Sequence, residues 1–222
     1  MTTAAAFLLA FPALFSIINP IGGALIFNEA TQELGPTDKR WVAGRVGFYS
    51  LLILIGALWG GAYVLNFFGV SLGALRIAGG AVVALNAWTL LTTPDRHEAQ
   101  QRREAEADLE DTKRNAMEMA FFPLTMPYTT GPGAIAVAIT IGAERPSNGI
   151  GLLDFFLGVT AAAVANALIV WIGYRFADRV TGWMGASARN ILARLTAFLL
   201  LCVGVQILVS GIGEAVSDWH AR

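Results

Sequence analysis

Six long apolar runs alternate with short polar segments along the chain, and this pattern predicts six transmembrane helices. Each run is near or above the roughly 20 residues that a helix needs to cross a bilayer. A cleaved signal peptide is an alternative for the first run, but no Lys or Arg precedes it and it is long, so we expect it to persist as a helix. The runs are approximately Ala4–Phe27, Trp41–Phe67, Leu72–Leu91, Ala116–Ile141, Gly149–Phe176 and Ile191–Ile212.

The first and fourth runs carry helix-breaking residues in their interiors. The first contains Asn19-Pro20-Ile21-Gly22-Gly23, and the fourth contains Thr130-Gly131-Pro132-Gly133-Ala134. Proline removes a backbone donor and glycine is a weak helix former. In lipid, the freed backbone groups must be satisfied by protein or by a water-lined cavity. We therefore expect both helices to be broken near the bilayer midplane, with proline kinks that bind no ligand as the alternative.

The central segment is strongly polar and separates two parts that have three apolar runs each. An odd number of helices inserts the two parts in opposite orientations, so an internal repeat would be inverted. Displacing the second part by 111 residues places Pro123 on Pro12 and Gly133 on Gly22. We therefore predict an all-α integral membrane protein built from two inverted three-helix repeats. The parts are residues 1–91, the polar linker 92–115 and residues 116–222.

Composition and charge agree with a multi-pass membrane protein. Hydrophobic residues make up 55% of the 222 residues and charged residues only 14%, whereas soluble domains carry about 25% charged residues. Lys and Arg concentrate in the loops between runs one and two, three and four, and five and six. The positive-inside rule assigns these loops to the cytoplasm. We therefore expect a protein of the prokaryotic inner (plasma) membrane with both termini outside.

The same inventory argues against several classes of function. A net charge of −1 offers no basic surface for nucleic acid. The two histidines and the single cysteine have no ligand-like spacing, and no catalytic motif is present. We therefore expect no enzymatic activity, no metal and no cofactor, while a homo-oligomer stays open as an assembly state.

The broken segments contain groups that suit a small ligand. The ends of half-helices present unpaired N–H groups at one end and unpaired C=O groups at the other. A zwitterionic amino acid needs donors for its carboxylate and acceptors for its ammonium group. No charged side chain lies at either break, which favours a small neutral solute. The predicted substrate-binding residues are Asn19, Pro20, Gly22, Gly23, Tyr128, Thr129, Thr130, Gly131 and Gly133.

Two charged residues near the ends of runs are candidates for coupling or gating. Arg76 lies about one turn into the third run, where it either snorkels to the interface, or else pairs with a helix dipole or gates the outer pathway. Glu118 begins the fourth run, where an acid either meets the positive end of the helix or carries a coupling proton. The sequence leaves both pairs of alternatives open.

Four motifs spread along nearly the whole chain carry a family resemblance. They are Phe15–Gly23, Phe68–Gly80, Pro123–Pro127 and Gly131–Ile135. Together they resemble the MarC family, which includes SnatA-type transporters of small neutral amino acids. The resemblance implies transport of glycine, alanine or similar solutes, coupled to a gradient of an ion such as H⁺ or Na⁺. A channel or efflux protein for other small solutes and a non-transporting membrane scaffold are the alternatives.

Overall fold

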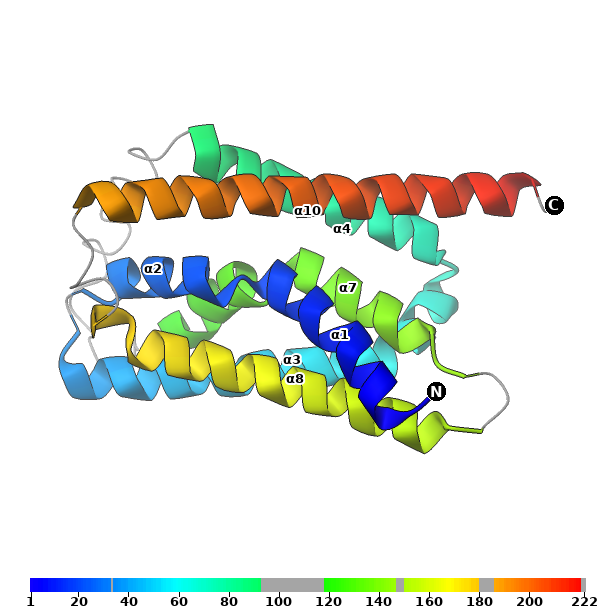
Figure 1. The fold of residues 1–222 in the computed structure, drawn as a ribbon, viewed down its shortest axis with the longest axis horizontal. Helices are drawn as coiled ribbons and strands as arrows, with labels where there is room; N and C mark the ends of the chain where they lie inside the picture. The colour runs from blue at the N-terminus through cyan, green and yellow to red at the C-terminus, as the bar shows by residue number, and fades with distance from the viewer. Residues whose placement is uncertain (33, 93–117, 147–149, 180–185, 221–222) are drawn as a thin grey trace.

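The computed structural model describes residues 1–32, 34–92, 118–146, 150–179 and 186–220, and every regular element in these ranges is a helix (Figure 1). One of them, η1, is a π-helix, and the others are α-helices. The helices are α1 (Thr3–Ile18), α2 (Pro20–Ala30), α3 (Pro36–Phe68), α4 (Leu72–Thr92), η1 (Ala120–Thr129), α7 (Pro132–Ala143), α8 (Leu152–Arg175) and α10 (Ala186–His220).

In the described part of the chain, five helical stretches are long and apolar enough to cross a membrane, which is consistent with the predicted integral membrane protein. They correspond to five of the six predicted runs, and α1 and α2 together make up the first. The fourth run is divided between η1 and α7, and the 12 residues of α7 extend for about 18 Å. A hydrocarbon core is about 30 Å thick, so α7 alone is too short to cross it. The five stretches are Thr3–Asn28, Pro36–Phe68, Leu72–Thr89, Leu152–Arg175 and Ala197–Ser217.

Helices α4 and α10 lie side by side as a tight pair along one side of the molecule (Figure 1). Their backbones touch at glycines: a Cβ atom on Gly80 would lie 2.8 Å from the carbonyl oxygen of Gly204. A Cβ atom on Gly204 would in turn lie 2.6 Å from the backbone nitrogen of Ala84. Small residues permit this approach between membrane helices. Only 11% of the most apolar stretch of α10 is buried, so most of that helix faces away from the rest of the protein.

Helices α3 and α8 organise the rest of the molecule: α8 contacts α1, α2 and α3, and α3 also contacts η1 and α7. Gly158 of α8 lies against the start of α1, where its Cβ atom would be 2.6 Å from the Cβ of Ala6. Further along, Asn166 Nδ2 donates hydrogen bonds to the carbonyl oxygens of Ala162 at 2.9 Å and Phe11 at 3.4 Å. The buried core between these helices is aliphatic and aromatic, and includes Leu14, Leu54 and Phe155.

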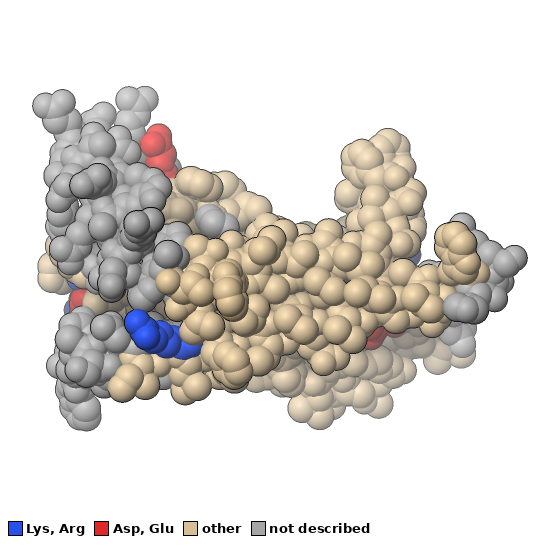
Figure 2. Space-filling view, turned by 90° about the horizontal axis from the view of Figure 1, so that it is seen from above, with Lys and Arg blue, Asp and Glu red and all other residues tan. Residues whose placement is uncertain are grey.

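Both chain termini lie at the same end of the molecule, and the connection from α2 to α3 lies at the opposite end (Figure 1). The space-filling view shows that the middle of one face is almost entirely free of charged side chains, as a lipid-facing surface requires (Figure 2). The assignment of one end to the cytoplasm stays a prediction from the loop charges.

Candidate functional site

The first break is centred on Asn19, which adopts the left-handed backbone conformation at φ 49° and ψ 65°. Its N–H donates to the carbonyl oxygen of Phe15 and so ends α1. Its side-chain Oδ1 accepts from the N–H of Gly22 at 3.3 Å, and its carbonyl oxygen accepts from Gly23 at 2.9 Å. Asn19 therefore closes α1 and caps α2, with Pro20 at the first helical position. The side-chain oxygen of Asn19 is therefore engaged within the break.

The second break is longer and confirms that the fourth run is interrupted. Phe122 and Met126 have extended backbone angles within η1, and Gly131 precedes α7 at φ −75° and ψ −179°. Threonine hydroxyls satisfy carbonyl groups along the irregular backbone. Thr125 Oγ1 donates to the carbonyl oxygen of Ala120 at 2.6 Å, and Thr129 Oγ1 donates to that of Leu124 at 2.7 Å.

Tyr174, near the end of α8, joins the two breaks. Its hydroxyl lies 2.7 Å from Thr129 Oγ1 in the second break and also against Gly23 of the first, where it takes the space that a Cβ atom would need. Its ring stacks on Phe27 of α2 with 4.7 Å between the centroids. Because the single proton of Thr129 Oγ1 points to Leu124, the Tyr174 hydroxyl must donate to Thr129. The lone pairs of the Tyr174 oxygen then stay available as acceptors.

Contacts between α2 and η1 agree with this convergence, so the two breaks lie next to each other. Among the predicted site residues, Pro20, Gly22, Gly23, Thr129 and Thr130 are buried, and Tyr128 and Gly131 are half-buried. Gly133 is also buried, but the position of its missing Cβ is occupied by Val83 of α4, so its small size serves helix packing. Tyr174 was not predicted: a tyrosine near the end of an apolar run has the usual pattern of an interfacial anchor.

The helix that follows each break begins differently. The side chain of Asn19 caps α2, whereas no side chain caps the start of α7. The first N–H groups of a helix have no carbonyl partner within that helix. Beside this uncapped start, Thr130 is fully buried, and its hydroxyl has no hydrogen-bond partner among the described residues.

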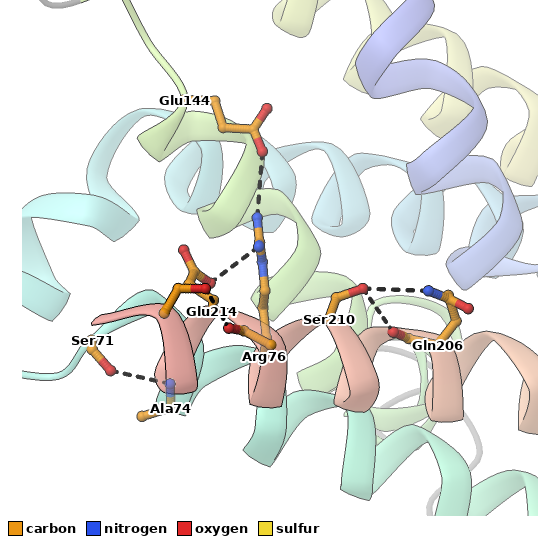
Figure 3. Close-up of polar contacts among 9 residues, drawn as sticks. Ser71, Ala74, Arg76, Glu144, Gln206, Ser210 and Glu214 are labelled. Atoms are coloured by element: carbon orange, nitrogen blue, oxygen red, sulfur yellow. Dashed lines mark hydrogen bonds and ion pairs between the residues drawn. The ribbon is translucent and has the colours of Figure 1, made fainter. Parts of the chain in front are cut away.

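The two charged candidates lie in different settings. Glu118 is exposed at the start of the described second half. Arg76 of α4 forms ion pairs with Glu214 of α10 at 3.1 Å and with Glu144, the residue after α7, at 3.4 Å (Figure 3). Neither reading of Arg76 from the sequence, snorkelling or pairing with a helix dipole, identified these two carboxylates as its partners.

A shallow groove of about 320 Å³ lies between α3 and α8, away from the breaks. None of the predicted site residues lines it. Among the described residues, no cluster of three or more His, Cys, Asp or Glu side chains is arranged to hold a metal ion. The groove is lined by Gly44, Gly47, Phe48, Leu51, Val164, Ala167, Leu168 and Trp171.

The long apolar helices define an integral membrane protein. Two of the predicted spans are interrupted, and neutral polar groups lie at both interruptions, inside the helix bundle. The chain belongs to the MarC family, because residues 4–216 match the sequence model of that family, described as MarC family integral membrane protein. It is 29% identical to the UPF0056 inner membrane protein MarC of Citrobacter koseri and 30% identical to that of Salmonella arizonae, each over 93% of this chain and 94% of the relative.

An archaeal relative is similar over a comparable length. A UPF0056 membrane protein of Methanocaldococcus jannaschii is 33% identical over 95% of this chain and 97% of that protein. No solved structure matches the chain. The matches therefore establish a multi-pass membrane protein of the MarC family, with relatives named as inner membrane proteins.

Proposed function

We propose that this protein transports small neutral amino acids, such as glycine or alanine, across the inner membrane by alternating access. The observation that carries the proposal is the meeting of two broken helices at Tyr174, through Gly23 on one side and Thr129 on the other. Interrupted helices near the bilayer midplane are the usual binding elements of secondary transporters. The resemblance to SnatA-type transporters points to the same class of solute.

The chemistry of the breaks suits an amino-acid zwitterion. The uncapped start of α7 offers backbone N–H groups and the positive end of a helix dipole to a carboxylate. The Thr130 hydroxyl is buried beside it and adds a donor. The free lone pairs of the Tyr174 oxygen offer an acceptor to the ammonium group. The sequence around the breaks, residues 12–27 and 120–143, contains no charged side chain, so a ligand of zero net charge leaves no uncompensated charge.

Alternating access requires parts of the protein that move against each other, and the inverted repeats supply two equivalent sets of helices for this movement. The contacts agree with inverted repeats, because they join the halves in equivalent ways: α1 and α2 of the first half pack against α8 of the second, while η1 and α7 of the second half pack against α3 of the first. Two further pairs, α3 with α8 and α4 with α10, join equivalent helices of the two halves. Exchanging the halves therefore reproduces the same set of contacts. The basic loops lie in the cytoplasm and both termini lie outside in this proposal.

Coupling to H⁺ or Na⁺ is part of the proposal, and Glu118 is the candidate carboxylate. Its side chain is exposed at the start of the described second half. A proton carrier must reach water from at least one side of the membrane, and an exposed acid at a span end meets that condition.

Counterflow of labelled alanine in proteoliposomes tests the function. Vesicles that contain the purified protein are loaded with unlabelled alanine and diluted into labelled alanine. A transporter gives saturable accumulation of label that excess glycine competes away. Linear flux without competition would instead indicate a channel, and no flux above protein-free vesicles for alanine, glycine or other small solutes would indicate a scaffold.

A further inference from the structure

We propose that Arg76, Glu144 and Glu214 form a latch that holds the α4–α10 pair against α7 at the end of the molecule that contains both termini. Figure 3 shows the Arg76 side chain between the two carboxylates, one from the end of α7 and one from α10. Its two terminal nitrogens each contact a different acid, at 3.1 Å for Glu214 and 3.4 Å for Glu144. The consequence for transport rests on the proposed function, whereas the latch itself does not.

The two ion pairs have different roles. Gly80 and Gly204 bring the α4 and α10 backbones into contact, so these helices move as one body. The Arg76–Glu214 pair lies within that body. The Arg76–Glu144 pair connects that body to α7, and it is the pair that must break when α7 moves away from α4.

The apolar interface between α4 and α7 is suited to such a movement. Gly79 of α4 lies against Ala136 of α7, and Val83 of α4 fills the space beside Gly133 of α7. Three of these four residues are Gly or Ala, so few side-chain atoms interlock across the interface. Because α7 begins at Gly131 and Pro132, separating it from α4 opens a route towards the second break from the end with the termini.

The ion pairs of the latch are weak enough to break and form again as the protein changes conformation. The side chains of Arg76, Glu214 and Glu144 are 23%, 30% and 47% exposed, so water weakens the attraction without removing it. An exposed ion pair shifts an equilibrium by about two- to fivefold. Loss of the Arg76–Glu144 pair is therefore expected to increase the open population by about that factor, while the fold stays intact.

Labelling of a single cysteine measures this population. Cys202, which is exposed, is replaced by Ser, and Val83→Cys places one thiol at the α4–α7 interface. In this background, Glu144→Gln is expected to increase the rate of labelling by a membrane-impermeant maleimide about two- to fivefold. Exchanging all three charges, Arg76→Glu with Glu144→Arg and Glu214→Arg, should return the rate towards that of the parent, because both ion pairs are then present again with their charges reversed.

Arg145 supplies a matched control at the same end of the molecule. Its guanidinium lies 4.4 Å from the ring centroid of Tyr63, and Arg145→Gln should leave the labelling rate at the parent value. Equal rates in Glu144→Gln and the parent, or equal increases in Glu144→Gln and Arg145→Gln, would overturn the latch. Labelling needs no substrate. If Glu144→Gln increases the labelling rate but the protein shows no alanine flux, only the proposed function is refuted. Alanine flux with unresponsive labelling would refute the latch alone.

Discussion

Replacement of Gly23 by Ala tests whether Tyr174 joins the two breaks as the structure describes. The new Cβ atom would overlap the Tyr174 hydroxyl and would lie 3.2 Å from the ring atoms Cε1 and Cζ. Overpacking of a core costs about 1–3 kcal/mol, and the better helix propensity of Ala returns about 0.5–1 kcal/mol. The net expected loss in the free energy of unfolding is therefore about 1–2 kcal/mol.

A double-mutant cycle isolates the contact. Tyr174→Phe alone removes the hydrogen bond to Thr129 at a cost of about 1 kcal/mol, but it also removes the atom that Gly23→Ala meets first. The double variant should therefore be more stable than the sum of the single losses by about 1 kcal/mol. The free energy of unfolding can be measured by SDS titration in mixed micelles. Gly60→Ala on α3, where a Cβ meets no atom within 4 Å, serves as the control and should not lose stability. Additive losses would refute the reasoning.

Three further predictions follow from single contacts. Gly204→Ala should destabilise the protein by about 1–3 kcal/mol, because its Cβ would meet the backbone of Ala84, while Gly213→Ala on the same helix meets no atom within 4 Å and should not; thermal melting in detergent compares them. Asn19→Ala should cost about 2 kcal/mol, from the lost cap and the left-handed backbone, whereas Asn19→Gly should fold normally and, if Nδ2 meets the solute, lose alanine counterflow. Glu118→Gln should fold normally, because the side chain is exposed, and should flatten the pH dependence of alanine flux; an unchanged pH profile would eliminate Glu118 as the coupling group.

The breaks could be predicted from the sequence because their causes are local. Proline and glycine act on the backbone within one turn, so Asn19-Pro20 and Gly131-Pro132 marked both interruptions before any packing was known. The apolar runs likewise predicted five of the spans, since a membrane imposes length and composition on each helix separately. The role of Asn19 was only partly visible, because a helix cap depends on the backbone angles of that residue.

The partners across the fold could not be predicted in the same way. Tyr174 meets Thr129 across a separation of 45 residues, and Arg76 meets Glu144 and Glu214 across 68 and 138 residues. No periodicity in one segment specifies which residue of another segment it will touch. Gly133 shows the same limit, because its sequence position does not identify Val83 of α4 as the residue that fills the space beside it.

The central claim is that the two breaks form one site whose carboxylate-binding part is the start of α7. Binding of alanine to Thr130→Val and Thr140→Val, measured by ligand-induced thermal stabilisation of the purified protein, tests it most directly. Both hydroxyls are buried without a partner among the described residues, and only Thr130 adjoins a break. Loss of a hydrogen bond to a charged group costs about 1.5–3 kcal/mol, so Thr130→Val should bind alanine at least about tenfold more weakly, and Thr140→Val should bind like the parent. Equal affinity of the two variants for alanine would contradict the account.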